Sequence, residues 1–163
     1  MPRRVRRLRR LRPVGLAYAD HAPVRLVFAA EIASPPAAVY AALAEDVEGA
    51  SRWVTGVSRA RSTAGGKGRE VTLSGGFRLV ETVLAAEPDE QYAYRVDGTN
   101  LPGPRTLLED WRLTPAGGGT RIRWTFATDG PVAYRFLMLL ARPGMGRAFR
   151  ASVRALDRRL AGR

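Results

Sequence analysis

Cysteine is absent from the 163-residue chain, and histidine occurs once, at His21. Without thiols there are no disulfides, thiolate nucleophiles, iron–sulfur clusters or cysteine zinc sites, and one histidine does not build a multi-histidine metal centre. Long apolar runs are also missing, so no segment offers the ~18 uncharged residues that a membrane-spanning helix requires. We therefore expect no metal and no cofactor, and much of the usual enzyme chemistry is excluded.

Acidic residues are few relative to basic ones, 15 against 27, which gives a net charge of +12. Residues 1–21 contribute +6 and residues 130–163 contribute +7, whereas the segment between them carries −1. All but one of the basic residues are arginine, a bias typical of a GC-rich bacterial genome. The composition alone suggests nucleic acid or an anionic membrane as a partner, but the body of the chain is neutral.

Residues 1–22 form a basic arm ahead of a single domain over residues 23–163. No apolar core follows the charges of the arm, so it is not a secretory signal. We expect the arm to be disordered, or to be an extension from an upstream start. Alternatively, Val5, Leu8 and Leu11 recur at every third residue, so a helix on an anionic membrane is compatible with the arm. The expected location is cytoplasmic, with contact at the membrane periphery.

Residues 24–32 (VRLVFAAEI) alternate between apolar and mixed positions, the period-2 pattern of a half-buried strand. Two short helices are predicted next, at 37–44 and 47–53. Six strand candidates follow, separated by glycine- and proline-rich turns that favour antiparallel hairpins over phosphate-binding loops. Their approximate spans are 56–63, 69–74, 77–87, 90–97, 105–114 and 120–128.

The last predicted element is a long helix over residues 131–160, which we expect to be interrupted at residues 143–144. Beyond that break Phe149, Val153 and Leu156 recur at helical spacing and form an apolar stripe. Only the sheet offers a surface on which to bury this stripe. The sequence therefore predicts an α+β fold: a curved antiparallel sheet of about seven strands wrapped around a long C-terminal helix, with two short helices after the first strand.

Several short motifs carry a resemblance to a known family. They are residues 31–40 (EIASPPAAVY), 52–54 (RWV), 111–115 (WRLTP) and 117–120 (GGGT), together with Pro88 and Trp124. With the order of the predicted elements, they resemble the START-like superfamily, and within it the polyketide cyclase/dehydrase-like SRPBCC group, which shares the helix-grip fold of Bet v 1. The resemblance covers residues 24–161. It implies a hydrophobic ligand held in a cavity between the C-terminal helix and the sheet.

Alternate residues of each predicted strand share a face, so the side chains that face such a cavity follow from strand parity. The C-terminal helix is expected to add further apolar side chains. The predicted ligand-binding residues are Leu79, Glu81, Tyr92, Tyr94, Leu107, Glu109, Trp111, Trp124, Phe126, Phe136, Leu140 and Phe149.

Two of these residues, Glu81 and Glu109, are acidic and lie in the middle of apolar strand faces. A carboxyl group that is desolvated in a cavity has a raised pKa and can act as a general acid or base. With Tyr94 as a hydrogen-bond donor to an enolate oxygen, they are the candidate catalytic residues. The alternative is structural: the two glutamates pair with arginines such as Arg95 or Arg78 at the edge of the sheet, or face solvent.

Three functions remain open. The residues favour a carrier or sensor that binds a hydrophobic small molecule, such as a lipid, an isoprenoid or a polyketide-like aromatic, without converting it. The first alternative is a cyclase, aromatase or dehydratase that uses the same cavity without a metal. The second is association of the terminal arginines, including Arg3 to Arg12, with an anionic membrane or a nucleic acid. Nucleic acid is disfavoured, because no aromatic residue is interleaved with those arginines.

Overall fold

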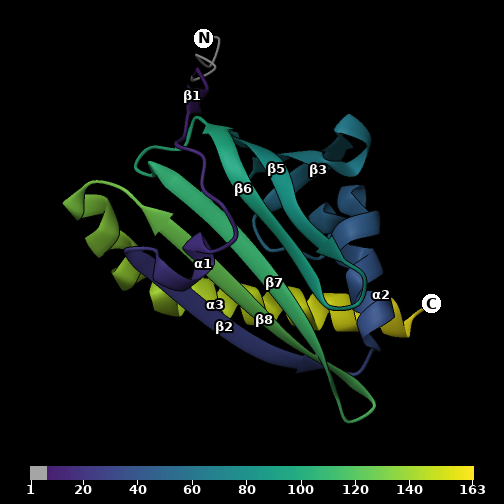
Figure 1. Ribbon diagram of the computed structural model, residues 1–163. Helices are drawn as coiled ribbons and strands as arrows, with labels where there is room; N and C mark the ends of the chain where they lie inside the picture. The colour runs from purple at the N-terminus through teal and green to yellow at the C-terminus, as the bar shows by residue number, and fades with distance from the viewer. Residues whose placement is uncertain (1–6) are drawn as a thin grey trace.

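The computed structural model describes residues 7–163 and has the predicted α+β architecture (Figure 1). Every predicted strand is present, and within residues 7–163 no helix is long and apolar enough to cross a bilayer. In chain order the elements are β1 (Arg9–Arg10), α1 (Tyr18–His21), β2 (Val24–Ile32), α2 (Pro36–Tyr40), the π-helical turn η1 (Ala41–Glu45), the 3₁₀ helix η2 (Val47–Arg52), β3 (Val57–Thr63), the 3₁₀ turn η3 (Ala64–Gly66), β4 (Gly68–Leu73), β5 (Phe77–Glu87), β6 (Gln91–Thr99), β7 (Thr106–Ala116), β8 (Gly119–Asp129) and α3 (Val132–Ala161).

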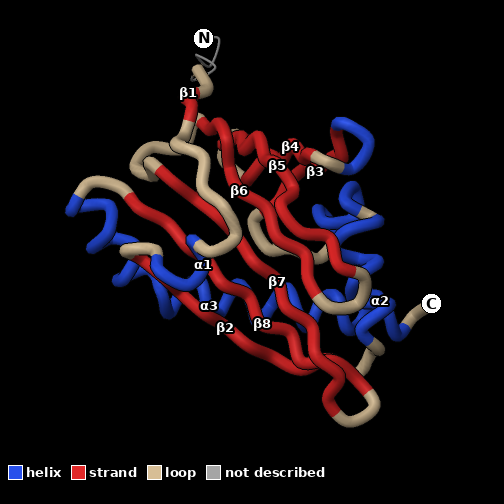
Figure 2. Tube along the Cα trace, viewed as in Figure 1, coloured by secondary structure: helices blue, strands red, loops and turns tan. Residues whose placement is uncertain are grey.

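One antiparallel sheet contains these strands in the order β2-β8-β7-β6-β5-β4-β3, with β1 added beside β6. Each strand from β3 to β8 pairs with its neighbour in sequence, as successive hairpins do. The strand β2 pairs with β8, so the first long strand lies beside the last one. Figure 2 shows the continuous red sheet, with the blue α3 on the face opposite to α1.

The helix α3 crosses the inner face of the sheet and lies behind it in Figure 1. Its second half buries Phe149, Val153 and Leu156, the stripe that the spacing predicted. Gly146 lets the helix approach β2 closely, because a Cβ at this position would come within 3.2 Å of the Phe28 ring. The sheet and the helix therefore enclose a core between them, as burial of two apolar faces requires.

The predicted break in the C-terminal helix is wrong, because α3 runs from Val132 to Ala161 with Pro143 inside it. A proline within a helix removes one hydrogen bond to the carbonyl four residues earlier, here that of Leu139. Leu139 is exposed, so water can bond to this carbonyl instead. The helical register is thus continuous from the exposed first turns of α3 to its buried second half.

The segment before β2 is folded where the structure describes it, which corrects the expectation of a disordered arm. Leu11 is buried, and its backbone N–H extends the β1–β6 pairing by donating to the carbonyl of Asp97 (2.8 Å). Tyr18 is buried against the outer face of the sheet, where its hydroxyl bonds to that of Thr106 (2.5 Å). Apolar residues placed among the arginines therefore anchor this segment. Residues 1–6, with the first arginines of the arm, lie outside the described residues.

Candidate functional site

A cavity of about 230 Å³ lies between α3, the inner face of the sheet and the helical elbow formed by residues 36–53. Its wall is mainly apolar, with a small group of polar side chains, which is the usual composition of a small-molecule site. The lining residues are Leu43, Ala50, Trp53, Val54, Thr55, Val57, Arg69, Val71, Leu73, Leu79, Glu81, Tyr94, Leu101, Leu107, Glu109, Trp111, Trp124, Phe126, Met145, Ala148, Phe149 and Ser152.

Most of the residues predicted from strand parity line this cavity. Strands β5, β7 and β8 supply them at alternate positions, and the register sets Glu109 beside Phe126 and Trp111 beside Trp124. The predicted residues found in the wall are Leu79, Glu81, Tyr94, Leu107, Glu109, Trp111, Trp124, Phe126 and Phe149. Their role in ligand binding stays a prediction.

Three predicted residues, Tyr92, Phe136 and Leu140, do not line the cavity. Tyr92 is buried in the core next to Tyr94, and the centroids of the two rings are 5.6 Å apart. Phe136 and Leu140 are each 63% exposed. Both belong to the first turns of α3, where Tyr134 is the one fully buried residue of the described stretch 132–143. Their apolar character therefore does not come from a role in the core.

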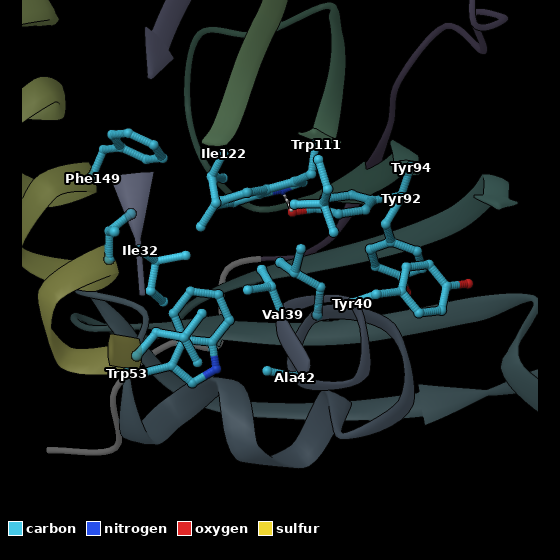
Figure 3. Packing of buried hydrophobic residues seen from close by; sticks show 14 residues of the cluster. Ile32, Val39, Tyr40, Ala42, Trp53, Tyr92, Tyr94, Trp111, Ile122 and Phe149 are labelled. Atoms are coloured by element: carbon cyan, nitrogen blue, oxygen red, sulfur yellow. Dashed lines mark hydrogen bonds between the residues drawn. The ribbon is translucent and has the colours of Figure 1, made fainter. Parts of the chain in front are cut away.

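A hydrogen-bond network on the cavity wall joins two tryptophans, a tyrosine and a glutamate. The Tyr94 hydroxyl donates to Glu109 Oε2 (2.8 Å), and the indole N–H of Trp124 donates to the same oxygen (2.9 Å). The indole N–H of Trp111 donates to the Tyr94 hydroxyl (3.1 Å), the contact drawn as a dashed line in Figure 3. Two donors on one carboxylate oxygen fix the orientation of Glu109.

The second cavity glutamate, Glu81, pairs with Arg69 on β4, and not with Arg95 or Arg78 as the structural alternative held. Arg69 Nε lies 2.8 Å from Glu81 Oε2, and the two side chains are 10% and 2% exposed. The strand register places these two residues directly opposite each other. The Arg69 guanidinium also lies over the Tyr94 ring, 4.1 Å from its centroid, so a cation–π contact supports its position.

Arg69 is the candidate site residue that strand parity alone missed, although the sequence holds a signal for it. The glycine turn between β4 and β5 pairs Leu73 with Phe77. Four residues further along each strand, the same register pairs Arg69 with Glu81. The position of the turn therefore predicts that this arginine and this glutamate face each other on the inner side of the hairpin.

The helical elbow and α3 supply about half of the remaining wall. Sequence periodicity shows that a helix has an apolar face, but it does not tell which turn of that face meets a cavity. The wall residues that were not predicted are Leu43, Ala50, Trp53, Val54, Thr55, Val57, Arg69, Val71, Leu73, Leu101, Met145, Ala148 and Ser152.

Burial changes the proton affinity of the polar groups. It raises the pKa of Glu81 to about 7, although the Arg69 charge acts in the opposite direction. Burial also raises the pKa of Glu109, partly offset by the hydrogen bond from Tyr94, and raises the pKa of Tyr94 well above its usual value. At Arg69 burial acts to lower the pKa, but the Glu81 carboxylate outweighs it and the net pKa is raised. The cavity therefore holds a lasting cation and two carboxyl groups that retain a proton at higher pH than usual.

This arrangement can bind an apolar molecule, bond to a polar group on it, and exchange a proton with it. Among residues 7–163 no group of three or more histidine, cysteine, aspartate or glutamate residues could hold a metal ion. The ionisable groups that line the cavity are the carboxyl groups of Glu81 and Glu109, the Tyr94 hydroxyl and the Arg69 guanidinium.

Comparison with known proteins places the chain in a family. The model for the family described as "Polyketide cyclase / dehydrase and lipid transport" matches residues 23–161. Uncharacterized proteins of Mycobacterium tuberculosis (strain ATCC 25618 / H37Rv) and Mycobacterium bovis are each 27% identical over 150 residues, which cover 89% of this chain and 89% of the relative.

Solved structures with the same fold include a START superfamily protein from Mycobacterium smegmatis, with a TM-score of 0.66 at 12% identity; the match covers 85% of this chain and 97% of that one. Ara h 8.0201 has a TM-score of 0.64 at 16% identity, with 86% and 99% covered. A largely apolar cavity in this fold is suited to a hydrophobic small molecule. Since the family model spans almost the whole described domain, the chain belongs to the polyketide cyclase/dehydrase and lipid transport family and has its START-like, SRPBCC-type fold.

Proposed function

We propose that this protein is a carrier or sensor that binds a compact, largely apolar molecule bearing one uncharged polar group. The observation that carries the proposal is the largely apolar cavity, on whose wall Arg69, Glu81, Tyr94 and Glu109 lie on four adjacent strands. Such a site buries the apolar part of a ligand and orients it through a few polar contacts.

The size of the cavity limits the ligand. A volume of about 230 Å³ lies below the range of about 300–1,000 Å³ that is usual for sites of drug-sized molecules. A one- or two-ring aromatic or a short acyl or isoprenoid chain fits this space. A long lipid or a multi-ring polyketide requires α3 to move away from the sheet. The compact members of the ligand classes predicted from the sequence are therefore favoured.

The charges in the wall favour a neutral polar group over an anionic one. Arg69 is the one arginine or lysine among the described lining residues, and Glu81 already opposes its charge at 2.8 Å. A ligand carboxylate would bring a further negative charge toward Glu81 and Glu109, and an uncompensated charge in an apolar site is costly. A hydroxyl or carbonyl group can instead bond to Tyr94 or Glu109. Alcohols, phenols and ketones are thus expected to bind better than carboxylates of the same shape.

Titration with 1-octanol and with octanoate, a matched neutral and anionic pair, tests this proposal. Trp53, Trp111 and Trp124 all line the cavity, so binding is expected to change the intrinsic fluorescence. We expect a saturable change with octanol and binding at least about tenfold weaker with octanoate. No saturable response to octanol, or tighter binding of octanoate, would contradict the proposal.

Two variants test whether octanol binds in the cavity. Ala148→Phe fills it from α3, and Ala50→Leu narrows it from the elbow, so both should weaken octanol binding. Ala133→Phe, at an exposed position of the same helix, is the control and should bind as the parent protein does. Far-UV circular dichroism checks that each variant is folded. Equal octanol binding by Ala148→Phe and Ala133→Phe would show that the probe binds elsewhere.

The two buried carboxyl groups support a second candidate function, acid–base conversion of the bound molecule. Glu109 is oriented by Tyr94 and Trp124, and burial raises the pKa of both Glu81 and Glu109. In a cyclase or dehydratase such a group removes a proton next to a carbonyl. Glu81→Gln and Glu109→Gln are then expected to abolish turnover of a poly-β-ketone and to keep octanol binding. Unchanged turnover would show that these residues take no part in the mechanism. Absence of turnover in the parent protein would reject the catalytic function and leave only the binding function.

A further inference from the structure

The first turns of α3 expose large apolar side chains to solvent. Residues 132–143 extend past the part of the helix that is packed on the sheet, and Tyr134 is the one fully buried residue of this described stretch. The exposed apolar side chains are Val132, Phe136, Leu137, Leu139 and Leu140, between 57% and 80% exposed. A cluster of large exposed apolar side chains on adjacent turns is typical of a surface that contacts another protein or a membrane.

Helical geometry gathers these side chains on one face. At 3.6 residues per turn, Val132, Phe136, Leu139 and Leu140 fall within an arc of about 100°, and Leu137 flanks it. Tyr134 lies on the opposite side, against the rest of the protein. The exposed apolar stripe therefore points away from the domain, and no rotation of the helix about its axis could bury it without exposing the packed side.

Basic residues of the N-terminal segment lie at the same end of the molecule. The Arg9 guanidinium donates to the carbonyls of Leu101 and Pro104, both at 2.6 Å. In the same loop Gly103 packs against the Tyr134 ring, close enough that a Cβ would overlap it. The loop thus connects the arginine-rich β1 segment with the start of α3, as the left side of Figure 1 shows.

Further arginines lie near the start of α3. The backbone N–H of Arg12 donates to the carbonyl of Arg105, and the N–H of Arg105 donates to the carbonyl of Asp129. Asp129 lies two residues before the N-cap residue of α3. The Asp129 carboxylate is itself bonded to Arg135 (2.7 Å). Arg142 is exposed on the flank of the stripe, two turns further along α3. The apolar face therefore lies within a surface of predominantly positive charge.

We propose that residues 132–143 of α3 dock on an anionic lipid bilayer, with the apolar stripe at the boundary of the acyl chains and the surrounding arginines against the headgroups. An exposed apolar face bordered by arginine is the composition of helices that lie in the membrane interface. Each basic residue near an anionic leaflet adds to the attraction. Two copies of this chain joined through the stripe would instead bring their arginines together without a compensating charge.

Docking in this orientation brings the cavity close to the bilayer. Met145, just past the stripe, is half-buried and lines the cavity, as does Leu101 from the loop that Arg9 holds. A molecule could thus pass between the cavity and the membrane along α3. This consequence rests on the proposed function, whereas membrane docking itself does not.

Vesicle flotation of the full chain tests the proposal, with phosphatidylcholine vesicles that contain or lack phosphatidylserine. The protein is expected to float with the anionic vesicles, and less so as salt is added. Phe136→Ser/Leu140→Ser should reduce the bound fraction at least about tenfold, because two interfacial apolar anchors are lost. Phe136→Leu/Leu140→Phe keeps the apolar area and should bind like the parent chain. All four substitutions are at exposed positions, so folding is preserved.

Charge variants give a second, independent comparison. Arg142→Gln/Arg147→Gln, beside the stripe, should weaken binding, whereas Arg154→Gln/Arg158→Gln, near the other end of α3, should not. No flotation of the parent chain, or equal flotation of the serine variant, would overturn the proposal. So would a dimer that the serine substitutions abolish in a chain that does not float. Ala148→Phe is expected to float normally, so failure of ligand binding and failure of docking are distinguishable.

Discussion

Replacement of Arg69 by methionine tests the charge arrangement on which the ligand proposal depends. The substitution keeps an apolar stem of similar length but removes the cation that faces Glu81, whose side chain is 2% exposed. Breaking a buried ion pair from one side costs about 3–5 kcal/mol, because the remaining charge is left uncompensated. We expect a loss of unfolding free energy of this size at about pH 8, where Glu81 is ionised.

The loss should shrink as the pH falls. The folded-state pKa of Glu81, about 7, is above its ordinary value of 4.5, so the folded protein binds more protons than the unfolded chain between these values. The contribution of Glu81 to stability is therefore most favourable at low pH and declines as the pH rises through this window. Without Arg69 the pKa of Glu81 rises further. At about pH 5 Glu81 is protonated in the variant, and much of the cost disappears.

Urea unfolding followed by tryptophan fluorescence at both pH values measures these effects. Arg61→Met is the matched control, because Arg61 pairs with Glu70 on the adjacent β3–β4 hairpin at 2.6 Å, but with side chains that are 54% and 31% exposed. An exposed pair contributes about 0–1 kcal/mol. Arg69→Met/Glu81→Gln should recover most of the stability. Equal losses for the two arginine variants, or a loss at Arg69 that does not change with pH, would refute the reasoning.

Three further substitutions test the fold around the cavity, each by urea unfolding. Leu11→Ala should cost about 2–5 kcal/mol, because Leu11 is 2% exposed in the core; an unchanged midpoint would mean that the N-terminal segment is not part of the domain. Tyr18→Phe should cost about 1 kcal/mol through the lost bond to β7, and no cost would place the hydroxyl in water. Gly103→Ala should cost at least about 1–3 kcal/mol, since Gly103 has φ +112° and packs on Tyr134, whereas Gly118→Ala, with open space around it, should stay within about 0.5 kcal/mol.

The strands and the strand-borne part of the cavity were predictable because one physical rule fixes both. Successive side chains of a strand point to opposite faces, so an inward Leu107 also directs Glu109 and Trp111 inward. Glycine-rich turns delimit the strands, and hairpin connections set their neighbours. Strand parity and turn positions are local features of the sequence, so they can be predicted without knowledge of the tertiary structure.

The helix-borne part was predictable only in part: Phe149 lines the cavity as expected, but periodicity identifies an apolar face and not what covers each turn of it. Phe136 and Leu140 have the composition of core residues, yet they are exposed. Leu11 lies within an arginine run, yet it is buried. In both cases the outcome depends on where α3 and the N-terminal segment meet the sheet, which is a property of long-range packing. Arg69 needed the pairing of two strands as well as their parity.

The fold also separates two uses of charge that composition merges. The excess of arginine is at the chain ends, and the structure brings Arg9 of the N-terminal segment, with Arg105 of the loop between β6 and β7, beside the start of α3 on the outer surface. In the cavity, the Glu81 carboxylate lies 2.8 Å from Arg69 and opposes its charge, so the arginine attracts an anionic ligand less than an unpaired cation would. A protein of net charge +12 can therefore be drawn to an anionic surface and still select a neutral ligand. Added salt should weaken the first interaction and leave the second unchanged, because charges inside the cavity are shielded from mobile ions.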